Sequence, residues 1–292
     1  MNAWLLENDR YRLTVNATGA ELSSIRDKLT AREWLWQPQP GVWDNSATQL
    51  FPVVGALVHE GVSVNGKFLP LPAHGFLRHQ AFTCIEQGAD HLVLEARATL
   101  ETLAVWPWCW RVELQLMLHE DGLSVSQRVI NDDRQPFLYS IGWHPGFALP
   151  VASEAGWQVR FGEKAVSGPF PTRNRTLVTK GQAQATTSFS LTEASFRDGA
   201  VYFGDCQQQH IRVCSPDGAT VMRVETAEHD WLALWGVPGA DLLCIEPLAG
   251  TTDEPDFDGH AENKRGIRQL VPGQSQAFRV RLRFAVDACA VD

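Results

Sequence analysis

Two histidines lie in local contexts that suit acid–base chemistry. His144 follows the apolar run Phe137–Ile141 and precedes Pro145, which biases it toward extended geometry. A histidine at a strand end can act as a general acid, because its ordinary pKa lies near neutral pH. His74 lies between a proline-rich loop and a predicted strand, four residues before Arg78. Taken alone, a histidine of either kind more often has a purely structural role.

A carboxylate follows an apolar run near the C-terminal end of the chain. Glu246 comes directly after Leu242–Ile245, a setting that predicts partial burial. A buried carboxyl group must be paired, hydrogen-bonded or shifted upward in pKa, and an upward shift produces a useful general base near pH 7. The alternative interpretation is a strand-end glutamate in a salt bridge.

Alternation of apolar and polar residues is the dominant pattern along the chain and is typical of β-strands with one buried face. The clearest apolar sets are Val112, Leu114, Leu116 and Leu118, and then Phe278, Val280, Leu282 and Phe284. Glycine-containing turns at 119–122 and 215–218 predict hairpins. No segment has a long apolar stripe with helical spacing. These patterns predict an all-β fold, a large antiparallel sandwich or barrel with few short helices, in a single domain spanning 1–292. The longest irregular stretch, 249–268, is expected to be functional or disordered.

Composition and charge exclude several classes of protein. The chain has 292 residues, 44% of them hydrophobic and 20% charged, which is ordinary for a packed globular protein. The net charge of −9 disfavours nucleic acid and anionic membranes as partners. No run is long enough to span a membrane, and the N-terminal sequence does not resemble a signal peptide. Six scattered cysteines without a C-x-x-C pair predict buried, reduced thiols in a cytoplasmic protein. Phosphate-loop, dinucleotide-binding and metalloprotease motifs are absent from the sequence, and we expect no cofactor.

Eight collinear stretches together resemble one family. From Gly19 onward the chain is similar to the aldose 1-epimerase (galactose mutarotase-like) superfamily, in its shorter bacterial branch. The matching stretches are Gly19–Ser24, Glu33–Trp36, Phe51–Gly55, His74–Arg78, Gly142–Pro145, Asp198–Phe203, Ile245–Pro247 and Leu270–Gly273. This resemblance implies a galactose mutarotase-like β-supersandwich. It also implies an isomerase that interconverts the α and β anomers of a hexose by opening and closing the ring.

The resemblance also implies roles for individual residues. His144 matches the general acid that protonates the ring oxygen, and Glu246 matches the general base that takes the anomeric proton. His74 and Asp198 match residues that bind sugar hydroxyls, and Arg78 matches an arginine that binds hydroxyls or a substrate anion. Sugar faces also stack on indole rings, so Trp143 and Trp43 are predicted to contact the substrate, although most of the eleven tryptophans are expected in the core.

Three positions depart from the pattern of the family. Ala56 replaces a common arginine after Phe51–Gly55, Leu248 replaces a common tryptophan after Pro247, and Gly146 follows the His-Pro pair. The predicted acid and base are intact, so these departures affect the choice of sugar more than the chemistry.

Other interpretations of the sequence stay open. A hexose-6-phosphate 1-epimerase would need a basic pocket, which Arg78 with Lys67 or Arg173 would supply. A non-catalytic sugar-binding or sugar-sensing protein would not need both His144 and Glu246. A metal site would have to be built from residues without ligand spacing, namely His59, His74, His79 and His144. We therefore expect no metal, a small sugar as partner, and a monomer or homodimer.

Overall fold

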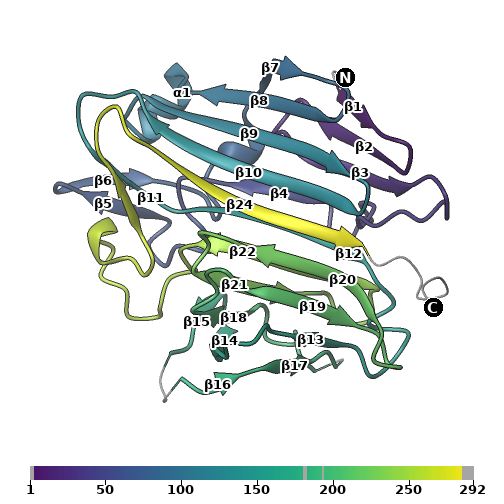
Figure 1. Ribbon diagram of the computed structural model, residues 1–292. Helices are drawn as coiled ribbons and strands as arrows, with labels where there is room; N and C mark the ends of the chain where they lie inside the picture. The colour runs from purple at the N-terminus through teal and green to yellow at the C-terminus, as the bar shows by residue number, and fades with distance from the viewer. Residues whose placement is uncertain (1–2, 180–182, 193, 285–292) are drawn as a thin grey trace.

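The computed structural model describes residues 3–179, 183–192 and 194–284, and two large antiparallel sheets dominate it (Figure 1). The larger sheet has nine strands, in the order β17 (Ser188–Ser190), β13 (Gln158–Arg160), β19 (His210–Cys214), β20 (Thr220–Thr226), β24 (Ser275–Phe284), β10 (Gly122–Asn131), β9 (Trp110–His119), β8 (His91–Arg97) and β7 (Thr83–Gln87). The eight-stranded sheet has the order β15 (Thr176–Leu177), β14 (Val166–Arg173), β18 (Val201–Gly204), β21 (Trp231–Trp235), β22 (Leu242–Ala249), β12 (Ile141–Ala148) and β4 (Ala47–Leu50), and β16 (Ala185–Thr186) also pairs with β14.

Smaller elements surround this sandwich. Three small sheets are formed by β1 (Ala3–Glu7), β2 (Tyr11–Asn16) and β3 (Leu22–Asp27), by β5 (Gly61–Val64) and β6 (Lys67–Pro70), and by β11 (Phe137–Tyr139) and β23 (Arg268–Leu270). The helical segments of the described residues are α1 (Leu100–Val105) and two short 3-10 turns, η1 (Leu77–His79) and η2 (Ala261–Asn263). The predicted all-β antiparallel fold with few short helices is therefore confirmed.

The alternating sequences form the strands predicted for them. Val112, Leu114, Leu116 and Leu118 are all buried on one face of β9, and Phe278, Val280, Leu282 and Phe284 are buried on β24. The predicted turn at 119–122 joins β9 to β10 as a two-residue hairpin, because Gly122 pairs with His119. The turn at 215–218 joins β19 to β20.

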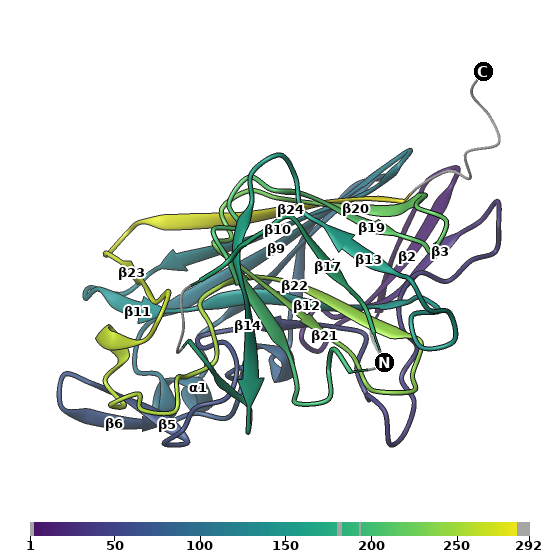
Figure 2. The ribbon, with the colours of Figure 1, turned by 90° about the horizontal axis from the view of Figure 1, so that it is seen from below.

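The two large sheets pack face to face. Figure 2 shows β24, β10 and β9 above β22, β12 and β21, and the apolar faces of the two sheets meet between the layers. The largest buried cluster runs from Leu6 to Phe284, which supports the proposal of a single domain.

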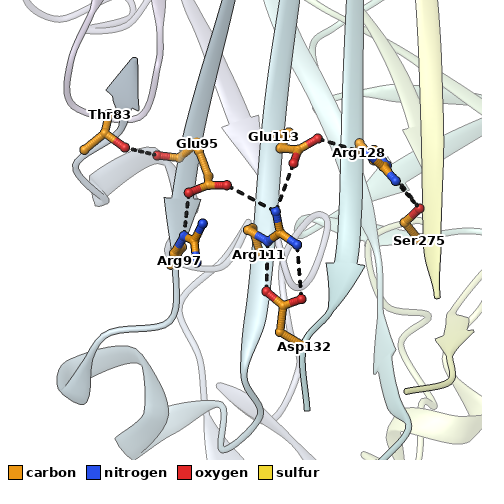
Figure 3. A network of polar contacts seen from close by, with 8 residues as sticks. All are labelled: Thr83, Glu95, Arg97, Arg111, Glu113, Arg128, Asp132 and Ser275. Atoms are coloured by element: carbon orange, nitrogen blue, oxygen red, sulfur yellow. Dashed lines mark hydrogen bonds and ion pairs between the residues drawn. The ribbon is translucent and has the colours of Figure 1, made fainter. Parts of the chain in front are cut away.

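The other face of the nine-stranded sheet carries charged side chains. Figure 3 shows a polar network across β8, β9 and β10, centred on Arg111. The Arg111 guanidinium donates to Glu95, Glu113 and Asp132. The polar members of the alternating pattern thus lie on the outward face and pair with one another across the strands.

Of the five described cysteines, which are all free, Cys206, Cys214 and Cys244 are buried as predicted. Cys84 and Cys109 are exposed, so the prediction of buried thiols is wrong for these two. The sixth, Cys289, lies outside the described residues. No helix among the described residues is long and apolar enough to cross a membrane.

One buried histidine is expected to make the fold sensitive to acid. His229 lies between β20 and β21 against Phe278, and neither ring nitrogen has a hydrogen-bond partner among the described residues. Burial lowers the pKa of His229 from 6.5 to about 3. Between these two pKa values His229 binds a proton in the unfolded chain but stays neutral in the folded chain. The free energy of unfolding therefore falls as the pH drops from 6.5 toward 3.

We expect His229→Leu to flatten this pH dependence. The free energy of unfolding is measured in urea between about pH 4 and pH 6. Its slope against pH should be smaller than in the wild type by about 1.4 kcal/mol per pH unit, which corresponds to one proton. The slope is compared, and not the absolute free energy, because leucine also changes the packing and so shifts the stability at every pH. His210→Leu removes an exposed histidine and should keep the wild-type slope. Equal slopes for wild type and His229→Leu would contradict the assignment.

Candidate active site

His144 and Glu246 lie opposite each other on neighbouring strands. In the antiparallel pair of β12 and β22, Gly142 pairs with Leu248 and Gly146 pairs with Cys244, which places His144 opposite Glu246. Their side chains emerge on the same face of the sheet, and His144 Nε2 is 3.4 Å from Glu246 Oε1. Two residues 102 positions apart in the sequence thus form one cross-strand pair.

The pair belongs to a row of side chains across the eight-stranded sheet. Glu246 pairs with Ala233 of β21, Ala233 pairs with Tyr202 of β18, and His144 pairs with Thr48 of β4. This row lies on the face turned away from the core between the sheets. The opposite face of β22 carries Leu243 and Ile245, which belong to that core.

Strand alternation places the Trp143 side chain on the face of the sheet opposite the site. Since His144 faces outward, its neighbour Trp143 faces inward, where it is fully buried in the main core. The prediction that Trp143 stacks on a sugar is therefore wrong, because no ligand can reach the ring. Trp43, the other tryptophan predicted to contact substrate, reaches the site from the loop before β4.

A cavity of about 300 Å³ opens over this row, a volume at the lower end of the range for small-molecule sites. Besides Glu246, its lining contains four of the groups predicted to bind or react with the substrate, namely Trp43, His74, Arg78 and His144. The lining residues are Trp43, Gly55, Ala56, Ala73, His74, Arg78, His144, Thr172, Arg175, Gly199, Ala200, Tyr202, Trp235, Glu246 and Thr252.

Aromatic rings hold His144 in place. The Trp43 ring stacks on the imidazole at 5.0 Å between centroids, and the Trp235 ring meets it edge-on at 5.9 Å. Nδ1 of His144 has no hydrogen-bond partner among the described residues, so packing orients the ring. Gly146 makes room for this arrangement, because a Cβ there would come within 2.6 Å of the Trp43 ring.

Two loops that are hydrogen-bonded to each other position His74. Its backbone N–H donates to the carbonyl of Gly55, and the N–H of Gly55 donates to Nδ1 of His74 at 3.2 Å. The neutral imidazole must therefore carry its proton on Nε2, which leaves a donor for a ligand. Gly55 has a positive φ of 75°, and a Cβ there would come within 2.4 Å of Thr252, so this contact requires glycine.

Burial sets the protonation of the central pair. It raises the pKa of Glu246 from 4.5 to about 8 and lowers the pKa of His144 from 6.5 to about 3. Burial and the charges of His144 and Arg78 also lower the pKa of His74 well below its ordinary value. At neutral pH these shifts leave both imidazoles neutral and keep a proton on the carboxyl of Glu246. Of the three outcomes left open for a buried carboxyl group at position 246, burial favours the raised pKa.

The site also contains residues that the sequence did not single out. Arg175 stands in the two-residue turn between β14 and β15, where it and Asn174 both have positive φ. The hydroxyl of Thr252 donates to the carbonyl of Arg175 at 2.6 Å and accepts from the N–H of Ala56 at 3.0 Å. A turn signal before a short strand gives no indication of which cavity the turn approaches, so these residues could not be found from local patterns.

Four further residues weighed from the sequence lie elsewhere. Asp198 is exposed beside the cavity, and the neighbouring Gly199 and Ala200 line it, so the sugar-binding role of Asp198 stays a prediction. Lys67 and Arg173, the suggested partners of Arg78 in a basic pocket, do not line the cavity. Leu248 packs outside it in a small apolar cluster with Leu50.

The predicted irregular stretch 249–268 borders the site at Thr252 and includes η2. It carries Thr252 into the cavity and contains a buried ion pair between Asp253 and Lys264. The described residues contain no group of three or more histidine, cysteine, aspartate or glutamate side chains arranged to hold a metal ion.

Comparisons with known proteins agree with the geometry of this fold. Residues 2–283 match the family model described as aldose 1-epimerase. The plasmid-encoded protein LacX of Lactococcus lactis subsp. lactis is 22% identical over 286 residues, which cover 91% of this chain and 94% of that protein. A galactose mutarotase related enzyme from Lactobacillus acidophilus has a TM-score of 0.91 and 24% identity, with both chains fully covered. A galactose mutarotase-like protein from Lactobacillus casei has a TM-score of 0.88 and 21% identity over 97% of this chain and all of that chain. At these identities the structural likeness shows the galactose mutarotase-like fold, as predicted.

Proposed function

The chain belongs to the aldose 1-epimerase family, and from that premise we propose that it interconverts the α and β anomers of a hexose. His144 and Glu246 are the acid and base of this reaction. The sugar ring opens to the aldehyde, the bond to the carbonyl carbon rotates, and the ring closes on the other face. The reaction requires proton transfers and no change in oxidation state.

The distance between His144 and Glu246 is the observation that carries this proposal. In a pyranose the ring oxygen and the anomeric hydroxyl are bonded to the same carbon, so the acid and base that serve them must be close neighbours on one surface. The separation of 3.4 Å between Nε2 and Oε1 meets this requirement. A groove that merely bound sugar hydroxyls would not need an imidazole and a carboxyl group in this arrangement.

The pair needs a single proton to work, and burial keeps one proton on the pair at neutral pH. Between the pKa of His144, about 3, and that of Glu246, about 8, the pair holds one proton, which lies on Glu246 before a sugar binds. A sugar that donates its anomeric hydroxyl to Glu246 and presents its ring oxygen to His144 favours the form with the proton on the imidazole. Glu246 then accepts the anomeric proton while His144 protonates the ring oxygen. The two roles reverse when the ring closes, and the pair returns to its first state.

The surrounding groups fit a hexose. His74 offers the N–H of Nε2 as a hydrogen-bond donor, and the rings of Trp43 and Trp235 offer apolar surface for a sugar face. Tyr202 lies in the same row as Glu246, and burial raises the pKa of its hydroxyl, which stays a neutral donor.

Polarimetry tests the proposal directly. Freshly dissolved α-glucose, α-galactose and their 6-phosphates should approach the anomeric equilibrium faster with protein than without it. Acceleration of at least one of these sugars is the expected result. If none is accelerated while calorimetry shows that a sugar binds, the protein is a sugar-binding member of the family instead.

We expect the catalysed rate to fall in alkaline solution. Above about pH 8 the pair loses its single proton, because Glu246 ionises and His144 cannot retain a proton. The value of kcat/KM, corrected for the spontaneous reaction at each pH, should be flat from about pH 5 to 7. It should decline toward a tenfold loss per pH unit above 8. A corrected rate that keeps rising through pH 9 would show that the ionised carboxylate with a neutral His144 is the active form.

A further inference from the structure

Two guanidinium groups face the same cavity from different loops. Arg78 belongs to η1, next to the loop that carries His74, and Arg175 stands in the turn between β14 and β15. Both act electrostatically on His74, and the charge of Arg175 also acts on Arg78. The charge of Arg78 acts on His144, and that of Arg175 acts on Tyr202, which lies beside Glu246.

Neither guanidinium forms an ion pair within the part of the chain that the structure describes. Arg78 donates from Nη2 to the carbonyl of Ala73 and from Nε to the ring of His79. The charge of Glu21 acts on Arg78 without forming an ion pair with it, because the Glu21 carboxylate accepts the backbone N–H groups of Ser46 and Ala47. Burial and the charge of Arg175 lower the pKa of Arg78, so the two cations repel each other.

The cavity is therefore positive although the protein is acidic. Of its ionisable lining groups, both histidines are neutral and Glu246 is protonated at neutral pH, which leaves the charges of Arg78 and Arg175. The chain as a whole carries a net charge of −9. Arg78 is half-buried and Arg175 is exposed, and a neutral hexose would leave both charges without a partner, whereas an anion would pair with both.

We propose that the substrate is a sugar that carries an anionic group, a phosphate or a carboxylate, and that Arg78 and Arg175 bind this group together. The proposal rests on the function proposed above and specifies its substrate class. Arg175 is the specificity-determining member, since its turn is anchored by the hydrogen bond from Thr252 and holds the guanidinium at the cavity. Guanidinium groups suit both oxyanions, because their planar N–H groups match two oxygens at once.

The test compares three sugars that differ in charge. Exchange between the α and β signals of glucose, glucose 6-phosphate and glucuronate is followed at equilibrium by NMR, which needs no pure anomer. The wild type should show a kcat/KM for at least one of the two anions that exceeds the value for glucose by more than tenfold. The anion with the higher value identifies the group as phosphate or carboxylate.

Arg175→Gln should lower the ratio of anion to glucose kcat/KM by roughly 10- to 100-fold, the strength of a charged hydrogen bond. Arg173→Gln is the matched control, because Arg173 is an exposed arginine on the same hairpin that does not line the cavity, and its ratio should equal that of the wild type. Equal or better use of glucose by the wild type, or the same ratio in Arg175→Gln as in the wild type, would overturn the proposal.

A binding measurement separates this inference from the proposed function. Inorganic phosphate should raise the melting temperature of the wild type and of Arg173→Gln more than that of Arg175→Gln. If no sugar is epimerised but this difference is found, the anion site stands and the epimerase proposal fails. If glucose is epimerised and phosphate stabilises all three proteins equally, the epimerase proposal stands and the anion site fails.

Discussion

Glu246→Gln should lower kcat by roughly 10²- to 10⁴-fold, with KM changed by only a few-fold. The amide keeps the size of the side chain and its place opposite His144, but it cannot accept the anomeric proton. An interaction that matters in the transition state and little in the bound ground state affects kcat in this way. Polarimetry or NMR exchange on the best substrate measures both constants.

His144→Asn should cause a loss of similar size, and the double variant should lose less than the product of the two. The acid and base move one proton through the same pair, so removing either one already disables the pair. Multiplicative losses would indicate two independent roles. Retention of wild-type kcat by Glu246→Gln would remove Glu246 from the mechanism.

The stability of Glu246→Gln as a function of pH tests the raised pKa of this carboxyl group. In the wild type the carboxyl ionises near 4.5 when unfolded and near 8 when folded, so its burial costs stability as the pH rises through this window. Glutamine does not ionise. The variant should therefore gain stability relative to the wild type between about pH 5 and pH 8, by roughly 1.4 kcal/mol per pH unit at most. Urea unfolding at several pH values gives this difference, and a constant difference would contradict the raised pKa.

Lys264→Met should destabilise the protein by about 3–5 kcal/mol, the usual cost of leaving one buried charge without its partner. Lys264 and Asp253 are almost completely buried, and the ammonium group donates to the carboxylate of Asp253 and to the carbonyl of Thr251. Asp253 in turn accepts the backbone N–H of Val58 at 3.0 Å. The pair therefore fastens the loop 249–268 to the loop that follows Gly55, and both loops line the cavity.

A double variant tests the cause of this destabilisation. Asp253→Asn with Lys264→Met removes both charges and keeps an oxygen that can accept from Val58, so it should be more stable than Lys264→Met alone. Urea unfolding at pH 7 measures all three proteins. Lys67→Met, at an exposed lysine on β6, is the control and should change stability by less than about 0.5 kcal/mol. A double variant no more stable than the single one would show that methionine packing, and not the unpaired charge, causes the loss.

Local sequence was sufficient to predict the strands and to single out His144 and Glu246 as candidates, whereas the roles proposed for them came from the family resemblance. The alternation in β9 and β24 and the turns at 119–122 and 215–218 specify hairpins through residues that are close in the chain. Glu246 could be recognised as a buried carboxyl group from the apolar residues before it. Pro145 gives His144 its extended backbone through direct steric contact, which also depends only on neighbours in the sequence.

Tertiary structure alone decided how these parts meet. The register of β12 against β22 places His144 opposite Glu246, and a register differing by one residue would have turned Trp143 toward the cavity in its place. Whether Trp43 or Trp143, and Arg175 or Arg173, faces the site depends on strand face and loop packing. These outcomes arise from contacts between residues far apart in the chain. The free energy of such contacts comes from burial and hydrogen bonding across the sheets, so no local pattern contains them.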